Sequence, residues 1–144
     1  MRKDMPAKSD HSIQHVVLAA IRRHGVDIGL WRFTFMGEKV STADIHLCET
    51  ELPILRVAKN DANWTLITTR RIIGVLNGQR TEMEVDQIDD YIVGLPKSTT
   101  HDFGVFRAND FYGVHKDFIM EAGYGRQAVI EALRFLIRSG KNEL

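Results

Sequence analysis

The sequence predicts an α+β fold, mainly β, with one helix near each end of the chain. Apolar residues recur at helical spacing close to both termini. Between residues 26 and 122 this spacing gives way to short runs of β-branched and aromatic residues, which are typical of strands. Within that stretch Asn77-Gly78 separates two such runs, and this dipeptide favours the tightest type of hairpin turn. We therefore expect an antiparallel meander between two helices.

Length and composition indicate a single globular domain. The chain has 144 residues, of which 44% are hydrophobic and 26% charged, as in an ordinary globular protein. A chain of this size can bury a self-sufficient core. We expect a flexible lead-in at residues 1–8 and one domain at residues 9–144, in which residues 9–25 form a helical extension.

The first helix is predicted in the stretch SDHSIQHVVLAAIRRHG. Ser9 or Asp10 can cap its N-terminus, and Gly25 stands where helices commonly stop. His11 and His15 lie one turn apart and could chelate a metal, but no third ligand is near, so we expect a polar surface there and no metal. The buried stripe is formed by residues at helical spacing: Ile13, Val16, Val17, Ala20 and Ile21.

The middle of the chain predicts a meander of six or seven strands, whose sequence signals range from strong to weak. In the first, Trp31, Phe33 and Phe35 alternate on one side, and we expect that side to face the core. The last two strands are expected to join at Asn109-Asp110. Eight runs are candidates for these six or seven strands: LWRFTF, ELPILRVAKN, NWTLITT, IIGVL, RTEMEV, DDYIVGLP, DFGVFRA and FYGVHKDFIME.

The hairpin around Asn77-Gly78 has one apolar and one acidic side. In its second arm Thr81, Met83 and Val85 are expected to face the core. The alternate residues, which are expected to face water, are Glu82, Glu84 and Asp86.

The stretch ADIHLCE also alternates and is predicted to be a strand with its polar face outward. Asp44, His46 and Cys48 have the residue types of a cysteine nucleophile with its base and orienting carboxylate. Same-face neighbours on a strand are ~6.6 Å apart, however, which is too far for the hydrogen bond that such a mechanism needs. We therefore expect a solvated strand face rather than an enzyme.

A second helix is predicted from about Tyr124 to Ser139, with Gly140 as its stop. Its solvent face is expected to carry Glu131, Arg134 and Arg138. Its buried face is formed by Val129, Ile130, Leu133, Leu136 and Ile137.

Three more residues widen the apolar arc of this helix beyond what one sheet needs. Ala128, Ala132 and Phe135 extend it on one side. Such an excess predicts a second packing partner, which is either the N-terminal helix or another subunit. These three residues are therefore the predicted interface for self-association or for a protein partner.

Charge and cysteine content exclude several classes of protein. Lys plus Arg equals Asp plus Glu at 19 each, which disfavours generic nucleic-acid binding. A single cysteine excludes an internal disulfide, and no signal peptide or transmembrane stretch is present, so we expect a cytoplasmic protein. Two charged segments are expected to be solvated: an acidic one (Glu82, Glu84, Asp86, Asp89 and Asp90) and a basic one (Arg126, Arg134, Arg138 and Lys141).

The stretch WTLITTRRIIGVLNGQRTEMEVDQIDDYIVG resembles the third-strand hairpin of bacterial pleckstrin-homology-like domains, and FIMEAGYGRQAVIEALRFLI looks like their last strand and capping helix. The positions that align are Thr68, Arg71, Ile72 and Ile88. This resemblance implies a bent antiparallel barrel closed by the C-terminal helix. Many bacterial members are interaction or oligomerisation modules. The Lys-x(n)-Arg-x-Arg pattern of phosphoinositide binders does not occur between Leu30 and Arg56.

The function that the sequence favours is a non-enzymatic binding or assembly module without a cofactor. The alternative is a site for a small anionic ligand or lipid head group at Arg70, Arg71 and Arg80. In that alternative Arg70 is the freer charge, while Arg71 is expected to support the turn. An enzyme that uses Cys48 and His46 is the least favoured hypothesis.

Overall fold

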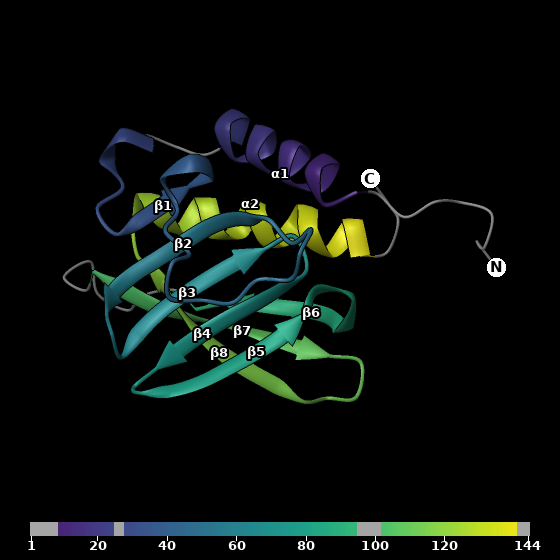
Figure 1. Cartoon of the computed structure of the whole chain (residues 1–144). Coiled ribbons are helices and arrows are strands. Elements are labelled where there is room, and N and C mark those ends of the chain that lie inside the picture. Colours follow the sequence, from purple (N-terminus) through teal and green to yellow (C-terminus); the bar gives the residue numbers. More distant parts are fainter. Residues whose placement is uncertain (1–8, 25–27, 95–101, 141–144) are drawn as a thin grey trace.

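The computed structural model of the chain describes residues 9–24, 28–94 and 102–140. The fold is α+β and mainly β, as predicted, with two antiparallel sheets and two helices that lie together on one side of them (Figure 1). The predicted lead-in at residues 1–8 and the predicted helix stop at Gly25 lie outside the described residues.

The elements follow the predicted order. The helices are α1 (Asp10–His24) and α2 (Tyr124–Gly140). Short 3₁₀ turns are η1 (Ile28–Leu30), η2 (Gly37–Lys39) and η3 (Val85–Gln87). The strands are β1 (Thr34–Met36), β2 (Pro53–Asn60), β3 (Asn63–Thr68), β4 (Arg71–Leu76), β5 (Gln79–Glu84), β6 (Ile88–Val93), β7 (Phe103–Asp110) and β8 (His115–Glu121).

The first sheet is a meander of β1 to β5 in chain order. Its most regular part is the β4–β5 hairpin, in which Asn77 and Gly78 have φ angles of 52° and 82°. These two positive φ angles are those that a two-residue hairpin turn requires, so the predicted turn is confirmed. The tight turn sets a register in which Arg71 pairs with Glu84 at the opposite end of the hairpin.

The second sheet contains β6, β7 and β8, and it packs against the first. The rings of Phe106 and Phe118 stack inside the core with their centroids 5.3 Å apart. The Thr65 hydroxyl of β3 donates a 2.6 Å hydrogen bond to the Ile119 carbonyl of β8 and so ties the sheets together. Strand pairing forms two sheets and does not show the closed barrel that the resemblance implies.

The helix α1 supplies the second partner that the wide apolar arc of α2 needs (Figure 1). Ala128 and Ala132 are 0% exposed within the single chain, so they are not accessible to another subunit. Phe135 is partly buried against the same core. Of the two partners that the sequence allowed for α2, the structure contains the N-terminal helix.

The solvent face of α2 differs from the prediction at one position. Glu131 is only 4% exposed, whereas Arg134 and Arg138 are exposed as expected. The Oε1 atom of Glu131 accepts a hydrogen bond from the side chain of Gln127, one turn earlier, and the Oε2 atom of Glu131 has no partner. The helix therefore buries a carboxylate on a flank where helical spacing alone predicts exposure.

The start of the first sheet also differs from the prediction. Residues 28–30 form a 3₁₀ turn, and β1 buries Thr34 while Phe35 is 40% exposed. The cause is Glu121, whose buried carboxylate accepts the Phe33 N–H at 2.9 Å and the Thr34 hydroxyl at 2.6 Å. This contact directs the Thr34 side chain inward, and successive strand residues then place Phe35 outward.

Two further local predictions are wrong. Residues 43–49 form a loop rather than a strand, because they pair with no neighbouring strand. The turn between β7 and β8 follows Asp110 instead of lying at Asn109-Asp110. The Asp110 carboxylate accepts the N–H groups of Tyr112 and Val114 at 2.8 and 2.9 Å, which closes a longer loop.

Candidate functional site

A groove of about 780 Å³ lies where the start of α1 meets the open end of the β4–β5 hairpin. Both arginines of the predicted anion site line it, so it is the natural place to test that prediction. Its lining residues are Asp10, Ile13, Cys48, Glu51, Thr69, Arg70, Arg71, Glu82, Met83, Glu84, Val85, Asp86, Gln87 and Ser139.

Arg71 is bound on three sides by the chain itself. Its Nε donates to Glu51 at 2.9 Å, and its Nη1 donates to Glu82 at 2.8 Å. Its Nη2 donates to the backbone carbonyl of His46 at 2.8 Å, which anchors the loop before β2. The hydrogen bond that Arg71 donates to Glu51 and the charge of both carboxylates raise the pKa of Arg71. This arginine is therefore a structural cation.

Glu51 is the buried partner in this network, with a side chain that is 0% exposed. Burial by itself raises the pKa of this carboxyl group, but hydrogen bonds from Arg71, the Thr68 hydroxyl and the Cys48 N–H outweigh it, so the pKa is lowered. A buried charge is tolerated only when it is paired and hydrogen-bonded, as Glu51 is.

Arg70 joins α1 to the turn between β3 and β4. Its Nη2 donates to Asp10 at 2.9 Å and to the Thr50 hydroxyl at 2.6 Å. The Thr69 hydroxyl also donates to Asp10, at 2.6 Å. The hydrogen bond from Arg70 is the main cause that lowers the pKa of Asp10 to about 2, against a smaller opposing effect of burial.

The cap of α1 follows from the same contacts. Ser9 is the capping residue, because its hydroxyl oxygen accepts the Ser12 N–H at 3.1 Å. Asp10, the other predicted cap, instead faces Arg70. Sequence reasoning missed Asp10 and Glu51 as the arginines' partners, because they precede them by 60 and 20 positions and no local spacing connects them.

The predicted anion site is not assembled. Arg70 and Arg71 are each neutralised by carboxylates, which leaves no unpaired cation at the turn. Arg80 on β5 pairs with Val75 on β4. Val75 lies four positions along β4 from Arg71, so Arg80 and Arg71 are about 13 Å apart along the hairpin. The three arginines therefore do not converge on one ligand.

The charge of the groove is instead negative. Five carboxylates line it, against the two guanidinium groups of Arg70 and Arg71. In the part of the chain that the structure describes, Glu84 and Asp86 form no ion pair. Ile13, Met83 and Val85 supply the apolar part of the lining. The groove can therefore accept a cationic group whose aliphatic stem packs on these three side chains.

No nucleophile and base come together at the groove. Cys48 is exposed and lines it, whereas the ring of His46 is not among its lining groups. Across residues 9–24, 28–94 and 102–140, no hydrogen bond joins the two side chains. Over the same residues, no three His, Cys, Asp or Glu side chains are placed to hold a metal ion.

A second buried carboxylate, Glu121, fixes the junction of β1, β8 and α2. It accepts the N–H groups of Arg32 and Phe33 and the hydroxyl of Thr34. Gly125 at the start of α2 leaves room for this contact, since an added Cβ would lie 2.7 Å from the Thr34 hydroxyl and 2.8 Å from Glu121. This junction is a structural contact that fixes where α2 begins.

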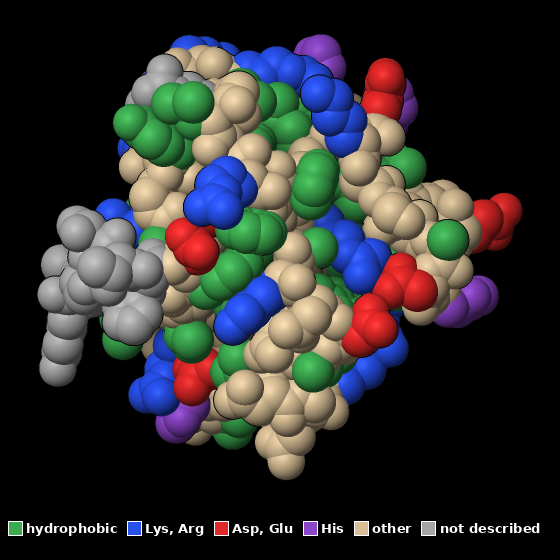
Figure 2. Space-filling view, turned by 90° about the vertical axis from the view of Figure 1, so that its left-hand side faces the viewer, with side chains coloured by type: hydrophobic (Ala, Val, Ile, Leu, Met, Phe, Trp, Pro, Cys, Tyr) green, Lys and Arg blue, Asp and Glu red, His purple; other side chains and the backbone are tan. Residues whose placement is uncertain are grey.

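The ion pairs spread beyond the groove. Arg56 binds Asp44 through two 2.9 Å hydrogen bonds, and its guanidinium group lies 4.7 Å from the centre of the Trp64 ring. On β7 and β8, Arg107 donates to Asp117 at 2.9 Å. On the face in Figure 2, several Lys and Arg side chains adjoin Asp and Glu side chains.

Comparisons with known proteins give no family for this chain. No protein-family model, curated protein or solved structure matches it. In the described part of the chain, neither helix is long and apolar enough to cross a membrane.

Proposed function

We propose that the chain is a non-catalytic binding module whose groove takes a positively charged segment of a partner protein. The surplus of carboxylates in the groove carries this proposal. Arg70 and Arg71 do not offset that surplus toward a ligand, because their donors already bind Asp10, Glu51 and Glu82. A lysine or arginine side chain of the partner would meet Glu84 and Asp86, which are unpaired in the described chain.

The order of elements supports a module of pleckstrin-homology-like type. All the strands pair antiparallel and a helix follows the last strand, as the resemblance implies, although the strands form two packed sheets. At the aligned turn, the Thr68 hydroxyl accepts the N–H groups of Arg70 and Arg71 at 3.1 Å. This geometry favours a structural role for the Thr-x-x-Arg arrangement over a role in ligand binding.

An anionic ligand is the weaker candidate. It would have to displace Asp10 from Arg70, or Glu51 and Glu82 from Arg71, while it approached Glu84 and Asp86. Like charges at short range cost free energy, and the buried carboxylate of Glu51 would lose its partner. The groove therefore favours cations over anions.

Fluorescence anisotropy with labelled peptides tests the proposal. A lysine- and arginine-rich peptide should bind more tightly than a glutamate-rich peptide of the same length, and its affinity should fall as salt increases. The double variant Glu84→Gln/Asp86→Asn should weaken this binding about tenfold, in line with two lost charge contacts of ~0.7 kcal/mol each. Equal binding of the two peptides would contradict the proposal.

A matched control separates the groove from the net charge of the molecule. The double variant Glu38→Gln/Asp61→Asn removes two exposed carboxylates that do not line the groove. It changes the net charge by the same amount as the groove variant and should leave peptide affinity nearly unchanged. A loss as large as that of the groove variant would show that binding depends on total charge alone.

A further inference from the structure

The arginines of the helices differ from those of the strands and loops. Outside the helices, five form ion pairs: Arg32, Arg56, Arg70, Arg71 and Arg107. Arg80 is the described exception. Among the described residues, none of the helix arginines forms an ion pair. We call these the basic helix face: Arg22, Arg23, Arg126, Arg134 and Arg138.

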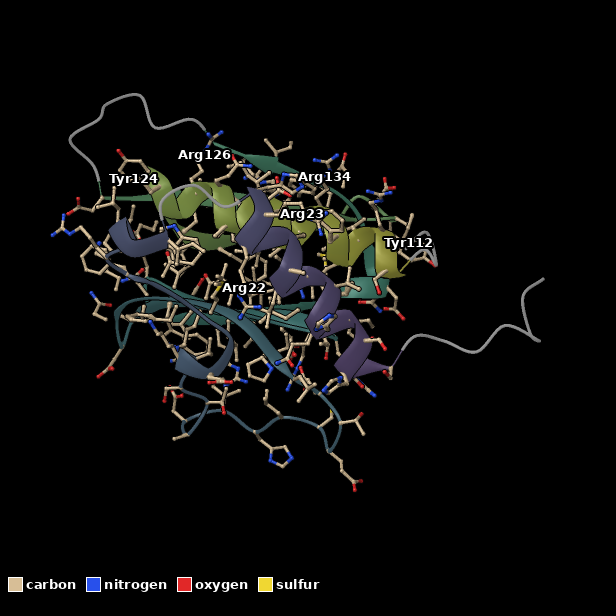
Figure 3. The ribbon with its side chains drawn as sticks, turned by 90° about the horizontal axis from the view of Figure 1, so that it is seen from above. Arg22, Arg23, Tyr112, Tyr124, Arg126 and Arg134 are labelled. Atoms are coloured by element: carbon tan, nitrogen blue, oxygen red, sulfur yellow. The ribbon has the colours of Figure 1, made fainter. Side chains whose placement is uncertain are left out.

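The basic helix face has no exposed acid on its own helices. Asp10 is held by Arg70, and Glu131 is buried. Figure 3 shows Arg22 and Arg23 on α1 and Arg126 and Arg134 along α2, with Arg22 and Arg134 on opposite sides of α1. The Nε of Arg126 is buried without a hydrogen-bond partner, which leaves one donor of this face unsatisfied.

Two of these cations lie near an aromatic ring of their own helix. The guanidinium groups of Arg134 and Arg138 lie 5.9 and 5.5 Å from the centre of the Phe135 ring. Such cation–π contacts hold an arginine in place without neutralising its charge. Restricting these side chains in advance lowers the entropy that binding would cost.

Arg138 precedes Ser139, a residue that lines the groove, whereas the far end of α1 lies apart from the groove. Asp10 lines the groove at the start of α1, and Arg22 is twelve residues further along the helix, which corresponds to about 18 Å. This separation exceeds the ~8 Å over which salt screens exposed charges. One chain therefore cannot neutralise its acidic groove with the far end of its own helix face.

We propose that a second copy of the chain is the partner, with its basic helix face seated on the acidic groove of the first copy. This inference rests on the proposed function of the groove. Charge complementarity supports it, because one sequence carries both unpaired surfaces and has equal numbers of basic and acidic residues, 19 each. Two copies with no net charge meet without overall repulsion.

Two variants that each lose one surface test the proposal by light scattering. The helix variant is Arg23→Gln/Arg134→Gln/Arg138→Gln, and the groove variant is Glu84→Gln/Asp86→Asn. At about 0.01 M salt the wild type should associate, and it should dissociate at about 1 M, where the screening length falls from ~30 to ~3 Å. Each variant alone should have the mass of a monomer.

The decisive sample is an equimolar mixture of the two variants. The helix variant retains an intact groove and the groove variant retains an intact helix face, so the mixture should form a 1:1 dimer with twice the monomer mass. A wild type that associates while the mixture remains monomeric would overturn the proposed contact. All substituted side chains are exposed, and circular dichroism of each variant confirms that loss of association is not loss of folding.

The outcome also separates this inference from the function on which it rests. If the wild type remains monomeric at low salt but binds the basic peptide, the second copy is wrong as the partner and the groove's function stands. If it neither associates nor binds the peptide, both proposals are wrong. An acidic peptide can also bind the basic helix face without reducing self-association. In that case the face serves a different partner, and the proposed contact between two copies is overturned.

Discussion

Arg71 and Arg134 are the same residue type in one molecule, yet their surroundings differ completely. Arg71 lies at the start of a strand and donates to Glu51, Glu82 and a backbone carbonyl. Arg134 lies on the outside of α2, where its guanidinium group is near one aromatic ring and no carboxylate binds it in the described chain. The arginine pair that looks like a ligand site in the sequence is structural, and the scattered helix arginines remain available for a partner.

The largest expected effect comes from removing the buried partner of Arg71. Glu51→Gln leaves this partly buried cation without its main counter-charge and should lower the free energy of unfolding by roughly 3 kcal/mol. Urea denaturation of this variant beside Glu38→Gln, which changes an exposed glutamate, measures the effect. A loss as small as that of the control would show that the strand arginines are no more structural than the helix arginines.

The next effect concerns the second buried carboxylate of the sheets. Gly125→Ala forces a Cβ against Thr34 and Glu121 and should cost about 1–3 kcal/mol of stability. Gly29→Ala is a matched control, because an added Cβ there meets no atom within 4 Å. Equal thermal stability of the two variants would mean that the Glu121 contact does not determine where α2 begins.

A smaller, pH-dependent effect is expected at Asp10. Its folded pKa of about 2 lies below the ordinary value of 3.8, so the pair with Arg70 stabilises the fold above pH ~4. Protonation of the unfolded chain removes this stabilisation as the pH falls from about 4 to 2. Asp10→Asn should therefore cost about 1 kcal/mol at pH 6.

The difference between wild type and Asp10→Asn should shrink steadily below pH 4 in urea titrations. Asp61→Asn, at an exposed position outside this ion pair, provides the baseline for the general effect of losing a carboxylate. A difference that stays constant down to pH 2 would show that folding does not lower the pKa of Asp10.

The smallest effect on stability is expected on the helices. Arg134→Gln removes an exposed cation with no acidic partner, so its unfolding midpoint in urea should match that of the wild type closely. The same substitution should nevertheless weaken self-association, because its charge is directed to a partner. A clear loss of stability would mean that Arg134 also supports the fold. The difference between the strand arginines and the helix arginines would then disappear.

Local sequence signals predicted most of the fold. The positive φ angles at Asn77 and Gly78 follow from two adjacent residues, and the helices follow from spacing within four positions. The first strand was wrong because its inward face is set by Glu121, which lies 87 positions from Thr34. No pattern within the strand itself contains that information.

The site was less predictable than the fold for the same reason. The sequence identified Arg71 as the support of a turn, and the structure shows that role. It treated Arg70 as the freer charge, because its partner Asp10 lies 60 positions away in the first helix. The groove itself depends on the start of α1 lying against the turn between β3 and β4, and no single segment signals it.

The most direct test of the contrast is an NMR measurement on the arginine Nε–H groups. The Nε atoms of Arg70, Arg71 and Arg107 donate to carboxylates, so their Nε–H groups should exchange slowly with water at every protein concentration. The signals of Arg134 and Arg138 should exchange quickly in dilute solution at low salt and shift on concentration. Rapid exchange at Arg71, or helix signals that do not respond to concentration, would contradict the account.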